Sequence, residues 1–153
     1  MLFLLFQLGT DRYALDASQV AEVLPLVSLK HIPQAPLGVA GVFNYHGAPV
    51  PVIDINELTL GWPAQRRLST RILLVHYPDA NGAKHLLGLI AEKATETMRR
   101  EPTDFRASGI TNDAAAYLGP VAPDARGLVQ WIEVNQLLPA SVRDVLFKQP
   151  EEN

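Results

Sequence analysis

The 153-residue sequence has no cysteine, no apolar run long enough to span a membrane and no cluster of basic residues. Without cysteine, the chain forms no disulfide, no thiolate nucleophile and no cysteine-ligated zinc site. The apolar opening at residues 1–6 has no basic region before it and ends at Gln7 and Gly9, so it predicts a buried strand, not a secretion signal. The 13 lysines and arginines are scattered, which argues against nucleic acid as a partner.

Catalytic motifs are missing too. The sequence has no glycine-rich phosphate loop, no Gly-x-Ser-x-Gly, no His-Glu-x-x-His and no paired carboxylates. His76 and His85 flank a turn and could begin a metal site, but no third ligand lies nearby in the sequence, so we interpret both as surface residues. We interpret His31 as solvated, whereas His46, in a turn between apolar strands, is a candidate for function. We expect no enzyme, no metal and no cofactor.

What the sequence does contain is a β-rich pattern. Twelve prolines and ten glycines interrupt it every few residues, which favours short strands over long helices. An apolar fraction of 48% and a net charge of −3 fit one compact domain with a sizeable core. Pro49 and Pro51 lack ladder donors, which places part of their strand at a sheet edge. Strands are predicted at residues 2–8, 12–16, 39–45, 48–53, 70–77, 84–90 and 128–132.

Short helices are predicted where capping residues precede apolar ones. The apolar spacing in residues 18–24 predicts about two helical turns, capped by Ser18 or Asp16, which Pro25 ends. Asp54 and Glu57 have the spacing of a capping box, and Gly61 is placed to end that helix.

The C-terminal third gives weaker signals. We expect loop at residues 102–127, with one capped helical turn at 112–118, and a last helix that Ser141 caps. Trp62 and Trp131 are expected to lie partly in the core, although a surface aromatic would serve an interface.

The chain also repeats itself. Residues 13–24 align without gaps with residues 87–98, and both are predicted to be a strand followed by a short helix. Residues 53–58 match residues 132–137 as a strand, an acidic cap and a helical turn. Chance matches between common motifs remain the alternative explanation. A true repeat predicts two similar small β-barrels.

The repeat sets the expected domain organisation. We expect one domain over residues 1–147, made of two barrel units at roughly 1–61 and 70–138, and a polar tail at 148–153. Because no linker composition separates the two units, they should share a core.

Residues 41–55, Gly-Val-Phe-Asn-Tyr-His-Gly-Ala-Pro-Val-Pro-Val-Ile-Asp-Ile, closely resemble the CheW-like domain of bacterial chemotaxis coupling proteins. That family has a glycine, an Asn-Leu-Arg-Gly turn and a Pro-Val-Ile-Asp strand end at this spacing. The resemblance covers nearly the whole chain and implies a mainly β fold of two five-stranded, SH3-like barrels around a common core, with short helices and a C-terminal helix. Further matching segments are residues 3–9, 20–23, 32–36, 87–89 and 117–119.

The resemblance implies a non-enzymatic adaptor. Such proteins link the cytoplasmic tip of methyl-accepting chemotaxis receptors to the regulatory domain of a CheA-type histidine kinase. The implied location is the cytoplasm, recruited to membrane-associated receptor arrays without membrane insertion. The receptor-binding residues that it implies are Val20, Glu22, Gly41, Asn44 and His46.

Gly88 and Gly119 correspond to family glycines that we assign to packing near the kinase-facing end. Each assignment has a purely structural alternative. Val20 could be core, the glycines could serve only the backbone conformation, and Asn44 could only hydrogen-bond the turn.

The sequence departs from the family pattern at the turn, where residues 44–47 read Asn-Tyr-His-Gly. Glu133 and Ala91 also replace usual aspartates of the second unit. A changed turn predicts a different receptor or kinase partner, and hence an auxiliary chemosensory pathway. The alternative function class is a small β-barrel that binds a ligand, or a hydrolase with dispersed residues, either of which would require a closed pocket.

The turn also raises a pH hypothesis. His46 takes the place of the family's turn arginine, which lies near the glutamate that corresponds to Glu22. If Glu22 and His46 are neighbours, protonation of His46 should tighten receptor binding toward pH 6. The alternative is that His46 only occupies an exposed turn and never meets Glu22.

Overall fold

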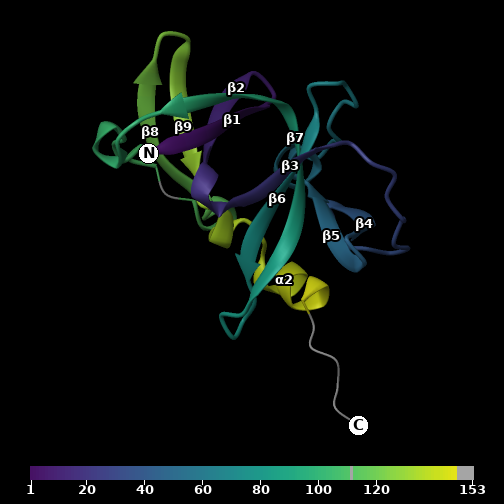
Figure 1. The fold of residues 1–153 in the computed structure, drawn as a ribbon. Coiled ribbons are helices and arrows are strands. Elements are labelled where there is room, and N and C mark those ends of the chain that lie inside the picture. The colour runs from purple at the N-terminus through teal and green to yellow at the C-terminus, as the bar shows by residue number, and fades with distance from the viewer. Residues whose placement is uncertain (111, 148–153) are drawn as a thin grey trace.

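Strands dominate the computed structural model, which describes residues 1–110 and 112–147 (Figure 1). The predicted polar tail at 148–153 lies outside the described residues. The strands are β1 (Leu2–Leu8), β2 (Asp11–Asp16), β3 (Val20–Pro25), β4 (Val39–Tyr45), β5 (Ala48–Asp54), β6 (Arg71–Pro78), β7 (Lys84–Arg99), β8 (Leu118–Asp124) and β9 (Gly127–Ile132). The helices are α1 (Ile55–Leu60) and α2 (Ala140–Leu146), and single 3₁₀ turns are η1 (Ala17–Gln19), η2 (Pro102–Asp104), η3 (Asp113–Ala115) and η4 (Val134–Gln136).

Strand β7 belongs to both halves of the molecule. Its residues 84–91 pair with β6 and β5, and β3 and β4 complete that five-stranded half, which we call barrel 1. Its residues 92–99 pair with β1, and β2, β9 and β8 complete the second half, barrel 2. The predicted fold of two five-stranded, SH3-like barrels is confirmed.

The sequence repeat is a structural duplication. β4 and β8 begin at Val39 and Leu118, and α1 and η4 begin at Ile55 and Val134, so both pairs lie 79 positions apart. The parallel ladders repeat as well. In barrel 2, Ala14 lies opposite Trp131; in barrel 1, the corresponding pair is Gly88 and Val52.

Each barrel takes strands from both copies of the repeat. β1 and β2 pair with β7 and β9, whereas β6 and β7 pair with β3 and β5. The units 1–61 and 70–138 therefore describe the duplication in the sequence, and the sheets cross the boundary between them.

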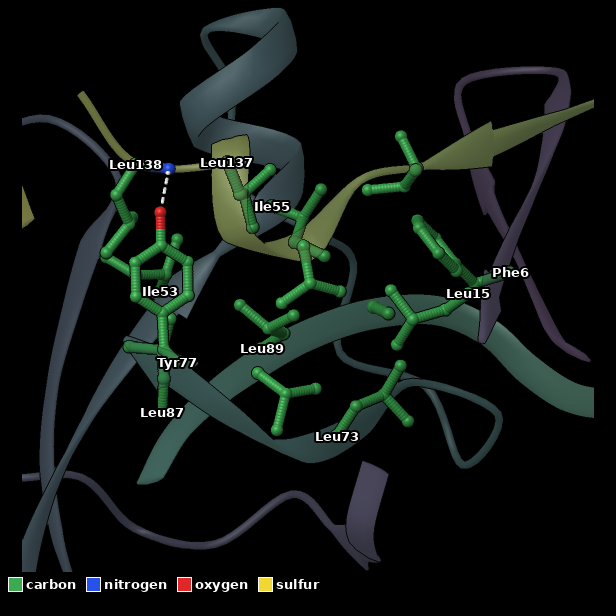
Figure 2. Packing of buried hydrophobic residues seen from close by; sticks show 14 of the residues in the cluster. Phe6, Leu15, Ile53, Ile55, Leu73, Tyr77, Leu87, Leu89, Leu137 and Leu138 are labelled. Carbon is green, nitrogen blue, oxygen red and sulfur yellow. Dashed lines mark hydrogen bonds between the residues drawn. The ribbon is translucent and has the colours of Figure 1, made fainter. Parts of the chain in front are cut away.

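The main core lies between the two barrels, as the expectation of a shared core requires (Figure 2). It takes Phe6 and Leu15 from barrel 2 and Leu73 and Leu89 from barrel 1, all almost fully buried. Tyr77 closes one end, where its hydroxyl accepts a hydrogen bond from the backbone N–H of Leu138 (2.9 Å). Smaller clusters fill the inside of each barrel.

The predicted helix at residues 18–24 is wrong. Asp16 caps only the single turn η1, and the chain then continues as β3, which pairs with β6. A bulge between Val20 and Glu22 shifts the side chains, so that apolar spacing typical of a helix occurs in a strand. The helix predicted after residue 90 is wrong as well, because β7 continues as a strand to Arg99.

Two further corrections concern the C-terminal third. β8 lies inside the segment that we expected to be loop, because Pro120 and Pro123 hid a strand at the sheet edge. Ser141 lies inside α2, whose N-cap is Pro139.

The cap of α1 and the edge position of two prolines of β5 are confirmed, but the reciprocal half of the capping box is not formed, because the Asp54 N–H donates to the Gly38 carbonyl. Asp54 accepts a hydrogen bond from the Glu57 N–H and caps α1, which Gly61 ends at φ +90°. Pro49 and Pro51 lie where β5 pairs with β4 alone, because its pairing with β7 starts only at Val52.

Candidate functional site

Two edge strands of barrel 1 are joined by a side-chain hydrogen bond. β3 and β4 are not paired to each other, and the Tyr45 hydroxyl of β4 donates to Oε2 of Glu22 on β3 (2.5 Å). This hydrogen bond raises the pKa of Tyr45 above its ordinary value of 10.0, because loss of the proton would leave two anions in contact. The Tyr45 hydroxyl therefore keeps its proton at neutral pH and can donate a hydrogen bond to Glu22.

The turn after β4 lies beside this pair. His46 and Gly47 have φ of +50° and +88°, as a two-residue hairpin turn requires, and Oδ1 of Asn44 accepts from the Gly47 N–H (2.7 Å). The exposed His46 ring packs edge-on against Tyr45, with 4.3 Å between ring centroids. Tyr45 therefore stands between Glu22 and His46, and the hydrogen-bond partner of Glu22 is Tyr45.

Val20 and Gly41 contribute in a different way. Val20 is half-buried against the core between the barrels. Gly41 is buried with φ +150°, and a Cβ there would lie 2.5 Å from the carbonyl oxygen of Lys30. Lys30 also exchanges two backbone hydrogen bonds with Val42. Gly41 therefore permits the backbone at Lys30 to lie close to β4, and so affects the shape of the backbone behind the turn.

The structure thus brings three of the five implied receptor-binding residues together at one exposed place: Glu22, Asn44 and His46. We call these three residues together with Tyr45 the turn face. Sequence reasoning did not single out Tyr45 as a site residue. Its position next to the turn was the available signal, but its contact with Glu22 depends on the pairing of β3, which was predicted as helix.

Gly88 and Gly119 lie in different barrels and do not form one surface. A Cβ on Gly88 would lie 3.0 Å and 3.1 Å from methyl carbons of Val52 and Ile72 inside barrel 1. A Cβ on Gly119 would lie 2.8 Å from the Trp131 carbonyl oxygen in barrel 2. Neighbouring atoms therefore leave little room for a side chain at either glycine.

The duplication gives barrel 2 a counterpart of the turn face. Glu96 and Asp124 occupy the positions equivalent to Glu22 and Tyr45, so two carboxylates face the same gap. Arg12 binds Asp124 (2.9 Å) and Arg126 binds Glu96 (2.7 Å). The hydrogen bond from Arg12 is the main reason that the pKa of Asp124 lies below its ordinary value. Ion pairs thus bridge in barrel 2 the gap that the hydrogen bond from Tyr45 to Glu22 bridges in barrel 1.

The histidines elsewhere do not assemble a metal site. His76 and His85 lie opposite Leu86 and Tyr77 in the β6–β7 ladder, and His85 bonds to Asp79 (2.8 Å). Within residues 1–110 and 112–147, no group of three metal-ligating side chains occurs. No helix in this part of the chain is long and apolar enough to cross a membrane. The clefts found at the described surface are open grooves.

Comparisons with known proteins agree on one family. The family model of the CheW-like domain matches residues 2–142. The chain is 29% identical over 104 residues to the chemotaxis protein CheW of Helicobacter pylori, which covers 67% of this chain and 59% of that protein. It is 35% identical over 52 residues to the chemotaxis protein CheW of Treponema pallidum, covering 34% and 31% of the two chains.

The fold also matches a solved structure. The crystal structure of the scaffolding protein TtCheW from Thermoanaerobacter tengcongensis superposes with a TM-score of 0.78 and 22% identity, over 92% of this chain and 89% of that one. At this identity, the likeness supports the fold alone.

Proposed function

Because this chain belongs to the CheW-like domain family, we propose that it is a chemosensory coupling protein that links methyl-accepting receptors to a CheA-type histidine kinase. Proteins of this family are scaffolds and adaptors without catalytic activity. The observation that carries the proposal is the turn face, where exposed polar groups lie at the unpaired edges of two strands. An exposed edge beside polar side chains suits docking of a partner's helix or strand.

The receptor tip would contact the turn face through Glu22, Asn44 and His46, with Tyr45 as a fourth contact. Val20 and Gly41 would shape the backbone behind it. The location would be a receptor array at the membrane. Because His46 replaces the family's turn arginine, we further propose that the receptor and kinase belong to an auxiliary pathway.

Gly88 and Gly119 would support kinase binding through the packing of the two barrels. No described cleft is a closed apolar pocket, and none therefore favours the alternative of a ligand-binding module or a hydrolase.

Reconstitution tests the proposal. The receptor in membrane vesicles, the kinase and this chain are combined, and kinase autophosphorylation is measured with and without the chain. We expect stimulation that depends on all three components and that falls with Glu22→Lys but not with Leu128→Ala, an exposed apolar change in barrel 2. If the chain binds neither partner and leaves the kinase unchanged, the proposal is wrong.

A further inference from the structure

The loop at residues 61–69, between α1 and β6, presents two large apolar side chains to solvent. Trp62 is 57% exposed and Leu68 is 100% exposed, whereas Trp62 was expected to lie partly in the core. Large apolar side chains do not stabilise a fold when they are exposed to solvent. Tryptophan and arginine are among the residues most enriched at the energetic centres of protein interfaces. This loop carries both, because Arg66 and Arg67 lie between the two apolar residues.

Buried polar side chains hold this exposed loop in place. Oδ2 of Asp54 accepts from the Ala64 N–H (2.9 Å), and Nδ2 of Asn56 donates to the Trp62 carbonyl (3.2 Å). Both side chains are about 95% buried or more, and Oδ1 of Asn56 has no hydrogen-bond partner in the described residues. A buried amide oxygen without a hydrogen-bond partner costs free energy. The other end of the Asn56 amide fixes the backbone at Trp62.

The far side of the loop is held in the same manner. The buried Thr70 hydroxyl donates to the Gln65 carbonyl (2.5 Å), and a carboxylate oxygen of Glu92 accepts from the Gln65 N–H (2.7 Å). A loop that is already ordered loses little conformational entropy on binding, so its contacts contribute more fully to affinity.

The charge of this surface defines the partner. Arg66, Arg67 and Lys93 are exposed and form no ion pair with any residue that the structure describes. A cleft of about 250 Å³ next to Trp62 is lined by Arg67 and Lys93, and its carboxylate, Glu92, is engaged with Gln65. The loop is therefore a basic, apolar surface on a chain whose net charge is −3. It fits an apolar pocket edged by aspartate or glutamate.

The position of the loop separates it from the turn face. β5 begins directly after His46 and Gly47 and ends at Asp54, which holds the loop. Seven extended residues at about 3.3 Å each place the two surfaces about 20 Å apart, at opposite ends of the strand. A coupling protein must hold two partners at once, and this separation permits it.

We propose that Trp62, Arg66 and Leu68 form a docking surface for the regulatory domain of the kinase, at an apolar patch edged by acidic residues. The inference rests on the coupling function proposed above, and it assigns the second partner to a surface that the sequence resemblance did not indicate.

Binding of the two partners to separate variants tests the inference. Affinities for the kinase regulatory domain and for a receptor-tip fragment are measured by titration calorimetry with Trp62→Ala, Leu68→Ser and Arg66→Glu. We expect kinase-domain affinity to fall roughly tenfold or more for Trp62→Ala and less for Leu68→Ser, with receptor affinity unchanged. Arg66→Glu should weaken kinase binding most at low salt, where charge attraction is least screened.

Leu37→Ser, a matched change of an exposed leucine elsewhere on barrel 1, is the control and should change neither affinity. Leu68 is fully exposed, so Leu68→Ser stays informative even if Trp62→Ala unfolds the loop. Wild-type binding to the kinase domain that none of the three loop variants alters would overturn the inference and leave the coupling function standing. Loss of receptor binding alone would reassign the loop to the receptor. Failure of the wild type to bind either partner would instead reject the coupling function.

Discussion

Tyr45 holds Glu22 across the gap between β4 and β3, and the ring of Tyr45 also packs against His46. Tyr45 thus makes the contact with Glu22 that an arginine at the position of His46 could make. Because the Tyr45 hydroxyl is uncharged, it does not offset the negative charge of the Glu22 carboxylate as an arginine would. The turn face therefore offers a partner a tyrosine-bound anion beside an exposed imidazole.

Tyr45→Phe should weaken receptor binding with little loss of stability. The hydroxyl group and its hydrogen bond are exposed, and an exposed hydrogen bond contributes little to folding because water competes for both groups. Its loss frees the Glu22 side chain, which must then be ordered when the partner binds. Calorimetry with a receptor-tip fragment and a thermal melt check the two effects. Tyr117→Phe, a tyrosine away from the turn face, is the control.

The pH hypothesis changes with this contact. Glu22 bonds to Tyr45, whose pKa is raised above 10.0, so the hydroxyl keeps its proton and can donate to Glu22 between pH 6 and pH 8. We therefore expect the receptor affinities of the wild type and His46→Arg to have the same pH dependence over that range. A wild-type affinity that rises toward pH 6 and is pH-independent in His46→Arg would contradict this expectation and show that protonation of His46 strengthens receptor binding.

Gly41→Ala should destabilise the fold substantially. The new Cβ would lie 2.5 Å from the Lys30 carbonyl oxygen, and φ +150° is a conformation that side chains disfavour. We expect a loss of about 2 kcal/mol or more, measured by urea unfolding. Gly47→Ala is the matched control, because Gly47 also has positive φ but has no atom within 4 Å of its Cβ position. Equal stabilities of the two variants would contradict the steric argument.

The sequence predicted the strands that glycine-containing turns delimit, whereas β3 and β8 were not predicted. The β4–β5 hairpin and the capped α1 follow from His46, Gly47, Asp54 and Gly61. β3 was missed because its apolar spacing fits a helix, and only pairing with β6 decides the matter. The turn of the candidate site was thus predictable, whereas its partner strand and the Tyr45 contact depend on tertiary pairing.

The duplication, too, was only partly predictable from the sequence. The two offsets were visible in the sequence, but the exchange of strands between barrels was not. Which hairpin pairs with which edge is decided by the shared core, to which both copies contribute large side chains such as Leu15 and Leu89.

The ion pair of Arg12 and Asp124 should make the folded chain less stable at acid pH than at neutral pH. The pKa of Asp124 is lower in the folded chain than the ordinary 3.8, so its contribution is present above that value and is lost as pH falls through the folded pKa. The melting temperature of Asp124→Asn should lie below that of the wild type at pH 7. The difference should shrink as pH falls below 3.8 toward the folded pKa of Asp124. A difference that stays constant down to pH 3 would show that the carboxylate charge is not the cause.

Gly88→Ala should destabilise barrel 1, and Val52→Ala should partly rescue it. The Cβ of an alanine at 88 would lie 3.0 Å from a Val52 methyl carbon, and overpacking of this kind costs about 1–3 kcal/mol. Val52→Ala removes that methyl group and by itself leaves a cavity. The double variant should therefore be more stable than the sum of the two losses predicts, as urea unfolding of all four proteins would show.

The same set of variants separates packing from partner contact. If Gly88 acts through packing alone, affinity for the kinase domain should follow the fraction of folded protein and recover in the double variant. Barrel 2 supports this expectation, because Ala14 occupies the position equivalent to Gly88 and fits there opposite Trp131. A double variant that folds like the wild type but still fails to bind the kinase domain would place Gly88 in the interface itself.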